Sequence, residues 1–480
     1  MAVDAEGPSV EKGRRPPSGS GEDNELRRGV LPLWAIFGVA LGVLAPSTTL
    51  ALAIGVVAAT SGSLSWLTWL LTSLVVVGFA GAIAWLASRH TTTGGLYGLA
   101  AKVSGPGGGY LVLVTQLSAV LLGGPACALG SALYFDAWLV RIGAPHGTPI
   151  LVAACVVVVV LNAVMCSREI KLAAKVLLAI EFLTVGVIVV LLAVVLVKAP
   201  GGPIDHTQFQ LHDVKLGAIL AAAGFSVFSM SGFENAANLG REARNPTRAI
   251  GIAMVGSIVT IGVLYVVASY VIVLGFHGRT FEGSSAPLDT LASDNGVGWL
   301  GYLIDLGVGV SFFGSSLGIM AGTSRTLYTL ARDAVLPRAF ARVHRTRRTP
   351  TTAVAVLAVI YLVLSVGGVL VTSAEHSYGL LGTLAGYLLV AAYGIATVVA
   401  GAYAVRTRSL GVGVVTAVLL GVAGVVLVYW FSFRPFPSGA FGIVAWIFIG
   451  VVVASVLTCV GLRTLAPRLL GRVGRSEANL

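Results

Sequence analysis

The chain has 480 residues, of which 56% are hydrophobic and 11% are charged, whereas soluble domains are about 45–50% apolar and about 25% charged. This composition excludes an ordinary soluble domain and indicates a protein that crosses a membrane many times. The formal net charge of +11 does not indicate nucleic-acid binding, because the basic residues lie between hydrophobic runs and form no patch interleaved with aromatic residues.

The first 28 residues differ from the rest of the chain. Residues 1–28 are polar and contain Pro, Gly and Ser, which predicts a disordered cytoplasmic tail and not a cleavable signal peptide. The four cysteines, Cys127, Cys155, Cys166 and Cys459, fall within or beside apolar runs and have no metal-binding or redox spacing. We therefore expect no disulfide framework, no metal site at these cysteines and no cofactor.

Apolar runs long enough to cross a bilayer, about 20 residues each, occur twelve times. We number these predicted spans 1 to 12, and their approximate ranges are 32–59, 64–87, 109–139, 149–166, 172–197, 216–239, 249–275, 297–330, 351–373, 378–404, 411–433 and 440–462. An even number of spans places both termini on the same side of the membrane.

The basic residues predict which side that is. With the amino terminus in the cytoplasm, the segments on the cytoplasmic side hold all of the 31 lysines and arginines except Arg141, Lys198, Lys215, Arg279 and Arg434. This asymmetry agrees with the positive-inside rule. Arginine far outnumbers lysine in a chain rich in Ala, Val and Gly, which is compatible with a GC-rich bacterial genome, so we expect a multi-pass protein of the bacterial inner membrane with both termini cytoplasmic.

Span 1 contains a break signal near its middle. Residues 45–49 read Ala-Pro-Ser-Thr-Thr, and a proline followed by three hydroxyl residues both removes a helix hydrogen bond and supplies alternative polar partners. The sequence therefore predicts an interrupted helix at 45–49.

The loop before span 3 and the small residues of span 8 are less specific signals. The loop between spans 2 and 3, 91–109, is glycine-rich and is predicted to form turns; a nucleotide-binding loop is disfavoured because no GxxxxGK[ST] element follows a strand. Span 8 carries small residues at helical spacing, which predicts a face that approaches another helix closely; these are Ser311, Ser315, Gly318 and Gly322. A basic amphipathic connector is predicted at 324–344.

Span 6 is interrupted by Ser229, Ser231 and Gly232. Because every backbone N–H and C=O in hydrocarbon must find a partner, such a break is tolerated only where protein or a water-filled cavity surrounds it. Glu234 would lie in the first turn of the restarted half-helix, near its positive dipole end, and Asn245–Pro246 would end that half-helix. Breaks in spans 1 and 6, five spans apart, indicate an inverted-repeat transporter with its binding site near the midplane.

Three segments together resemble one family, the amino acid-polyamine-organocation (APC) superfamily of transporters. They are GG-L-Y with a following GP at 94–106, SGFENAANLGREARNPTRAI at 231–250 and SRTLYTLARDAVLPRAFARV at 324–343. The resemblance implies an all-α membrane protein of twelve transmembrane helices with the leucine-transporter-like 5+5 inverted repeat and discontinuous spans 1 and 6. The ten-span transport core would occupy 29–405, spans 11 and 12 would occupy 406–465, and a cytoplasmic tail would occupy 466–480.

The resemblance also implies a substrate site at the two breaks. In similar transporters the carboxylate of an amino acid rests on backbone amides in span 1, and its ammonium group rests on carbonyls exposed in spans 1 and 6. Charge gives the same assignment, because half-helix amino ends attract anions and unwound carbonyls attract cations. By position, the implied substrate-binding residues are Pro46, Ser47, Thr48, Thr49, Phe228, Ser229, Met230, Ser231, Gly232 and Phe233.

Acidic residues in the spans are hypotheses for coupling or gating. Some proton-coupled relatives use a lysine in span 5, but 176–197 contains no lysine and Glu181 lies near that place; it either carries a proton or is a protonated group packed between helices. Glu234 either gates the site or supports its half-helix. Asp305 either lines the external vestibule or is simply hydrated there, and hydration is favoured.

The coupling ion is predicted to be the proton. Deep carboxylates are present, whereas a full set of sodium-coordinating oxygens is not identifiable. Ser311 and Ser315 resemble in position the hydroxyls that complete a sodium site in some relatives, but serines at helix contacts are common. The segment 45–49 also departs from the GxG found in many relatives of this family, so the ligand's identity is not carried over from them.

We therefore expect a secondary active transporter that moves an amino acid or a related amine across the bilayer by alternating access. No enzyme is expected, because no nucleophile is accompanied by a His/Asp set. A zwitterionic amino acid is favoured over a polyamine, which would need more acidic groups. Open alternatives are an amino acid exchanger or exporter and, in another class, a transport-inactive receptor or assembly subunit; the oligomeric state is also open.

Overall fold

A computed structural model of the chain describes residues 33–90, 95–168, 171–210, 216–239, 246–276, 286–343 and 349–474. Within these ranges every regular element is helical, as predicted. The predicted amino-terminal tail and the Asn245 part of the predicted stop after span 6 lie outside the described residues.

The helices divide into long ones, which are long enough to cross a bilayer, and short ones at breaks and connections. The long helices are α4 (Ser65–Ala87), α6 (Pro106–Arg141), α7 (Thr148–Arg168), α8 (Lys171–Lys198), α10 (Pro246–Phe276), α12 (Trp299–Arg332), α13 (Thr351–Val371), α14 (Ala374–Arg406), α15 (Val412–Ser432) and α16 (Gly439–Leu465). The short elements are α1 (Leu33–Val43), α2 (Pro46–Thr48), η2 (Thr49–Ala53), α3 (Ile54–Ser61), η3 (Gly62–Leu64), α5 (Gly95–Ser104), η4 (His206–Phe209), α9 (Leu216–Ser229), η5 (Phe233–Leu239), α11 (Pro287–Asp294), η6 (Arg338–Ala341) and α17 (Pro467–Leu470).

Eleven stretches of the described residues are long and apolar enough to cross a membrane. The first, Ile36–Ala87, has 52 residues and contains the tight 3₁₀ turn η3, which begins at Gly62 with a φ of 61°. Since one crossing needs about 20 residues, this stretch has the length for two. The protein is a multi-pass membrane protein, and the twelve-span inverted repeat remains a prediction.

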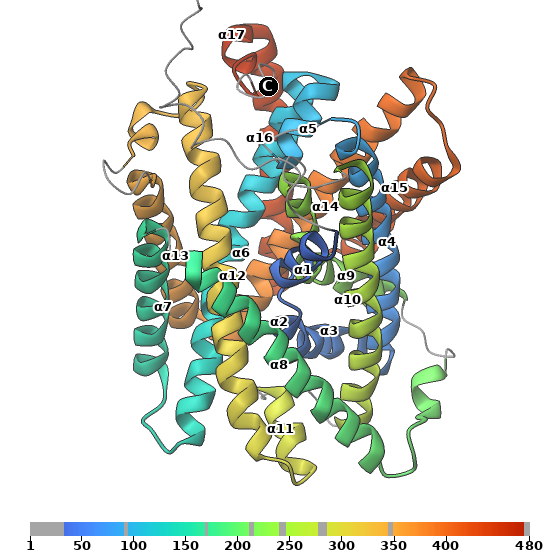
Figure 1. Cartoon of the computed structure of the whole chain (residues 1–480), viewed down its shortest axis with the longest axis vertical. Helices are drawn as coiled ribbons and strands as arrows, with labels where there is room; N and C mark the ends of the chain where they lie inside the picture. Colours follow the sequence, from blue (N-terminus) through green and yellow to red (C-terminus); the bar gives the residue numbers. More distant parts are fainter. Residues whose placement is uncertain are drawn as a thin grey trace, which may run out of the picture.

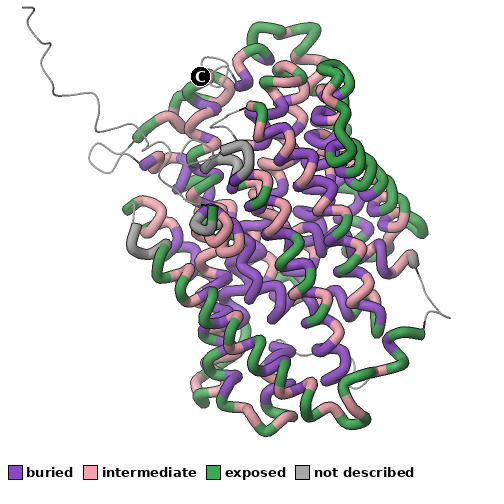
Figure 2. The backbone as a smooth tube through the Cα atoms, turned by 45° about the vertical axis from the view of Figure 1, so that its right-hand side comes forward, coloured by how far each residue is buried: buried purple, intermediate pink, exposed green. Residues whose placement is uncertain are grey.

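Helix α6 connects many of the other helices. It packs most extensively against α14 and α12 and also contacts α5, α7, α13 and α16. Its middle turns contain small residues, and a Cβ atom added at Gly130 would lie 2.6 Å from the Phe312 ring, so only glycine allows α12 this close. Figure 2 shows the buried residues gathered through the middle of the bundle and the exposed ones on its outside.

The two ends of the bundle carry different elements (Figure 1). Helices α5 and α17 lie at one end, and α11 lies at the other. We refer to these as the α17 end and the α11 end.

The predicted turn-forming loop between spans 2 and 3 is partly wrong. Residues 95–104 form helix α5, and the Gly-Pro-Gly-Gly-Gly string begins α6, with Gly105 at φ 80° and Pro106 in the first turn. Proline suits that position because the first turn of a helix needs no N–H donor. A Cβ atom at Gly109 would lie 2.5 Å from Ala101 of α5, so these glycines allow two helices to meet.

Two predictions about span 8 also need correction. A Cβ atom at Gly318 or Gly322 would meet nothing within 4 Å, so this part of the small-residue face does not approach another helix. The close approach lies nearer the α11 end, where a Cβ atom added at Gly309 would lie 3.1 Å from the Phe135 ring of α6. The predicted connector also begins too early, because α12 continues to Arg332.

Candidate functional site

The helix of span 1 is interrupted where the sequence predicts. Helix α1 ends at Val43, Ala45 adopts the left-handed conformation with φ 43° and ψ 61°, and α2 begins at Pro46. A non-glycine residue in that region is strained and needs surrounding structure to hold it. The chain then forms the π-helix η2 before returning to α-helix in α3.

Span 6 is interrupted as well. Helix α9 ends at Ser229, Gly232 has a φ of 114°, and the 3₁₀ helix η5 begins at Phe233. Glycine is suited to that φ because it has no Cβ atom. The restarted segment is a 3₁₀ helix instead of the expected α-helical half, with Glu234 in its first turn as expected.

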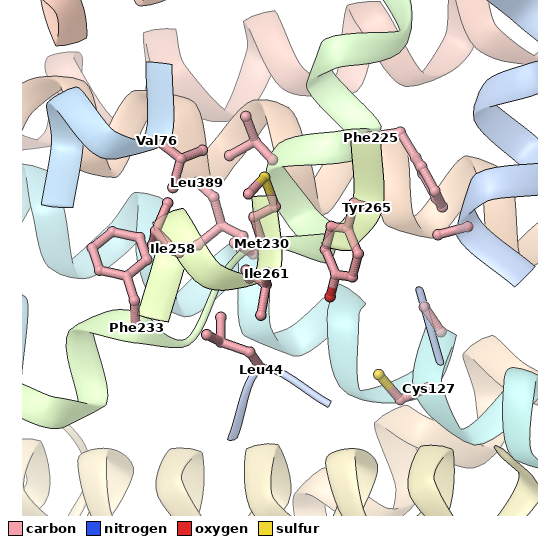
Figure 3. Close-up of a cluster of buried hydrophobic side chains, with 14 of the residues drawn as sticks. Leu44, Val76, Cys127, Phe225, Met230, Phe233, Ile258, Ile261, Tyr265 and Leu389 are labelled. Carbon is pink, nitrogen blue, oxygen red and sulfur yellow. The ribbon is translucent and has the colours of Figure 1, made fainter. Parts of the chain in front are cut away.

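The two breaks lie side by side. A Cβ atom at Gly232 would lie 3.2 Å from Cγ1 of Val43, and Thr49 Oγ1 donates to the carbonyl of Ser229 at 3.4 Å. Figure 3 shows Leu44, from the first break, and Met230, from the second, in the same buried cluster. The structure therefore brings together the two segments from which the sequence predicts a substrate site.

Glu181 joins three helices at the first break. Its side chain, on α8, is only 4% exposed. It accepts hydrogen bonds from the backbone N–H of Ser47 at 2.8 Å, from Ser47 Oγ at 2.9 Å and from Ser311 Oγ of α12. The carboxyl group thus ties α8 to the start of α2 and to α12.

Glu234 joins the second break to two long helices. Its Oε2 accepts hydrogen bonds from the Gly232 N–H at 3.0 Å and from the Tyr393 hydroxyl of α14 at 2.9 Å. Its Oε1 accepts one from Gln116 Nε2 of α6 at 3.4 Å. This arrangement both caps η5 and connects it to α6 and α14. The same hydrogen bonds would therefore serve Glu234 in either role, as support of its half-helix or as a gate of the site.

Asp305 is fully buried beside an arginine, contrary to the favoured prediction that it is exposed to water. Its side chain is fully buried in α12, and its Oδ2 lies 3.4 Å from Nε of Arg141, at the end of α6. Arg141 also forms an ion pair with Asp289 of α11 and donates to the carbonyl of Gly298 at 2.7 Å. The three charged groups thus hold α11 against the ends of α6 and α12.

Aromatic side chains surround the break in span 6. Phe228 lies between two glycines, since a Cβ atom at Gly123 of α6 or at Gly382 of α14 would be 2.8 or 3.2 Å from its ring. Phe225, one turn earlier, packs edge-on against Tyr378, with ring centroids 5.6 Å apart. The end of α9 before the break therefore meets small and aromatic residues of α6 and α14, whereas Glu234 after the break meets their polar groups Gln116 and Tyr393.

Sequence analysis did not identify several partners of these groups. Gln116 and Tyr393 were not named as site residues, and Arg141 was named only for topology, although a polar side chain within an apolar run is a recognisable signal. Gln116 and Tyr393 bond to Glu234, and Arg141 pairs with Asp305. The sequence does not show which polar groups pair with each other, because the partners come from different helices.

Comparison with known proteins agrees with this geometry. A profile of the family described as "Amino acid permease" matches residues 31–462. An uncharacterised transporter of Mycobacterium tuberculosis is 35% identical over 182 residues, which are 37% of this chain and 41% of that protein. The branched-chain amino acid permease BcaP of Bacillus subtilis is 24% identical over 137 residues, 28% of this chain and 30% of BcaP.

A third relative is the glutamate/serine transporter AimA of Bacillus subtilis, 29% identical over 135 residues, which are 26% of this chain and 25% of AimA. The matched stretches thus cover well under half the length of each of these relatives, whereas the family profile covers nearly the whole chain. Family and relatives indicate a transporter and not an enzyme. With its paired helix breaks and this match, the chain belongs to the amino acid permease family.

Proposed function

We propose that the protein is a secondary active transporter that moves a zwitterionic amino acid by alternating access and couples this movement to protons through Glu181. The observation that carries the proposal is the position of the Glu181 carboxyl group, bonded at once to the break in span 1 and to α12. Movement of span 1 relative to α8 and α12 would therefore change the hydrogen bonds of this carboxyl group.

A zwitterion suits the charges at the breaks. Each break leaves helix ends in the interior, and such ends attract the carboxylate and the ammonium group of an amino acid. The two acidic groups at the breaks, Glu181 and Glu234, already accept hydrogen bonds from protein donors. The relatives BcaP and AimA are named for amino acids with uncharged and with acidic side chains, which supports an amino acid and leaves the side chain open.

Proton coupling follows from what a carboxyl group can bond. Ionised Glu181 accepts all of its hydrogen bonds, whereas the protonated group must donate one. Protonation therefore changes the bonding between α8, the start of α2 and α12. A ligand or ion shifts a conformational equilibrium only through such a difference between states, so binding or loss of a proton would bias outward-facing against inward-facing states.

We further propose that the α17 end faces the cytoplasm of a bacterial cell. In that orientation the connector after α12, with Arg332, Arg338 and Arg342, lies inside, as does α17. This arrangement follows the positive-inside rule. Residues 29–405 would then form the transport core, with α15 and α16 beside it.

Uptake by purified protein in liposomes tests the proposal. Wild-type protein should accumulate one or more neutral amino acids when the outside is made acidic, in potassium buffer without sodium. The Glu181→Gln variant keeps the shape and cannot release a proton, so pH-driven accumulation should fall to background, while exchange of internal for external amino acid continues. Glu375→Gln, at the start of α14 and with no hydrogen bond to either break among the described residues, is the matched control.

Four outcomes would contradict this proposal. If Glu181→Gln accumulates substrate with the pH dependence of the wild type, Glu181 is a structural residue and Glu234 is the next group to test. If accumulation follows a sodium gradient and ignores pH, proton coupling is wrong. If the wild type exchanges amino acids but never concentrates them, the protein is an exchanger, and if it moves none, a receptor or assembly subunit is supported.

A further inference from the structure

Two hydroxyl groups at the breaks are buried without a hydrogen-bond partner among the described residues: the Tyr265 hydroxyl on α10 and the Ser229 Oγ at the end of α9. Tyr265 is fully buried. Buried polar groups in native proteins are nearly always paired, and each exception needs an explanation. Both hydroxyls lie beside the proposed path of the substrate, so a bound substrate would supply the missing partner.

Six backbone N–H groups at the breaks already have partners within the protein in this structure. Ser47 N–H is bonded to Glu181, and Thr48 and Thr49 N–H are bonded to the carbonyls of Ala45 and Pro46. At the second break, the N–H groups bonded within the protein are those of Met230, Ser231 and Gly232. A substrate carboxylate that enters this arrangement must therefore find other donors or displace an existing bond.

The packing of its aromatic ring fixes the position of the Tyr265 hydroxyl. The ring packs edge-on against Trp69 of α4, with centroids 5.1 Å apart, and Trp69 is itself fully buried. The Thr49 side chain of η2 lies beside the hydroxyl, but its hydrogen bond goes to the Ser229 carbonyl and not to Tyr265, and Glu181 is near enough to act on the hydroxyl through its charge. Figure 3 shows the side chain of Tyr265 beside Met230 and Ile261. A donor that is already fixed binds its partner at low entropic cost.

Ser229 lies opposite Thr49 of η2. Its carbonyl accepts the hydrogen bond of Thr49 Oγ1, so Thr49 is near both unpaired hydroxyls. Thr49 directly follows α2, near the amino end of the second half of span 1. The helix dipole is positive at that end, which favours an anionic group.

We propose that the Tyr265 hydroxyl donates a hydrogen bond to the carboxylate of the transported amino acid, with Ser229 Oγ as a second donor. This inference rests on the proposed function and adds span 7 to the substrate site. It places the carboxylate between η2, α9 and α10, and it makes a free carboxylate a requirement for tight binding.

The test compares two tyrosine variants. Tyr265→Phe removes the hydroxyl and keeps the ring packing. Tyr361→Phe is the matched control, because Tyr361 is also fully buried with an unpaired hydroxyl but belongs to a separate cluster between α7, α12 and α13. The measurements are KM for uptake of the amino acid that wild-type protein transports best, thermal stability without substrate, and inhibition of uptake by the amide derivative of that amino acid.

Tyr265→Phe should raise KM by about tenfold or more, the usual consequence of losing a hydrogen bond to a charged group, and thermal stability without substrate should not fall. Inhibition by the amide, which lacks the carboxylate, should be equally weak in wild type and variant. Ser229→Ala should raise KM in the same direction, and Tyr361→Phe should not change it.

The inference is wrong if Tyr265→Phe binds the amino acid like the wild type, if Tyr361→Phe weakens binding equally, or if the variant loses as much affinity for the amide as for the amino acid. These results leave the proposed function standing, because wild-type transport is measured in the same experiment. If wild-type protein neither transports nor binds any amino acid, the proposed function and this inference both fail.

Discussion

At the scale of single residues, the break in span 6 depends on one backbone conformation. Gly232 has a φ of 114°, which L residues rarely adopt, and a Cβ atom there would lie 3.2 Å from Val43. Its N–H is also bonded to Glu234. Conformation, close approach and hydrogen bonding therefore all constrain this position.

We predict that Gly232→Leu abolishes uptake while the protein still inserts into the membrane. The leucine would force the backbone out of its present conformation and push against α1. The two breaks would then move apart. Uptake in liposomes and the yield of monodisperse protein are the measurements. Gly318→Leu is the control, because Gly318 is exposed on α12 with nothing within 4 Å of its Cβ position. Wild-type uptake by the Gly232 variant would contradict the prediction.

At the scale of elements, charged groups hold the short helix α11 in place. Arg141, at the end of α6, is paired with Asp289 of α11 and with the fully buried Asp305 of α12. Helix α11 also contacts η2, and a Cβ atom at Gly55 of α3 would lie 3.3 Å from Pro287. The ion pairs thus fix a helix that covers the second half of span 1 at the α11 end.

We predict that Arg141→Met destabilises the protein by about 3 kcal/mol, since removing one partner of a buried ion pair leaves the other charge unpaired. The double variant Arg141→Met with Asp305→Asn should recover part of this loss, because it removes the stranded charge. Arg338→Met, at an exposed arginine of η6, is the control. Thermal or denaturant unfolding in detergent gives the values, and equal stability of the single variant and wild type would show that the pair contributes nothing.

At the scale of the whole molecule, the bundle has two distinct ends, with α5 and α17 at one and α11 at the other (Figure 1). The C-terminal segment is part of this organisation, since Leu470 and Val473 are buried and Arg472 donates to the carbonyl of Ala334 at 3.3 Å. The proposed orientation assigns the α17 end to the cytoplasm.

We predict that a thiol at the α11 end reacts from outside the cell and one at the α17 end does not. In a variant with its native cysteines replaced by serine, Ser293→Cys in α11 should be labelled by a membrane-impermeant maleimide in intact cells. Arg338→Cys in η6 should be labelled only after the cells are opened. Both positions are exposed. The reverse pattern would invert the topology, and labelling of both in intact cells would mean that the assay does not separate the two sides.

Local features of the chain were sufficient to predict much of this molecule. Apolar runs predict membrane helices because the bilayer requires about 20 apolar residues wherever they occur, and Pro46 and Gly232 predict the breaks because their backbone preferences act on their own turns. The family motifs are local as well. The twelve-span count and its repeat remain predictions, since the structure has eleven suitable stretches, one of them long enough for two crossings.

The partners of the polar groups were decided only by the tertiary structure. Glu181 bonds to Ser47 and Ser311, which are 134 and 130 residues away, and no pattern near Glu181 contains that information. Burial likewise depends on neighbours: Asp305 was expected to be hydrated from its depth, but Arg141 arrives from another helix. By itself the sequence determined the membrane-spanning character, the breaks and the family, because these follow from local hydropathy and backbone preference; the tertiary structure decided which groups meet, because contacts between helices depend on how the whole bundle packs.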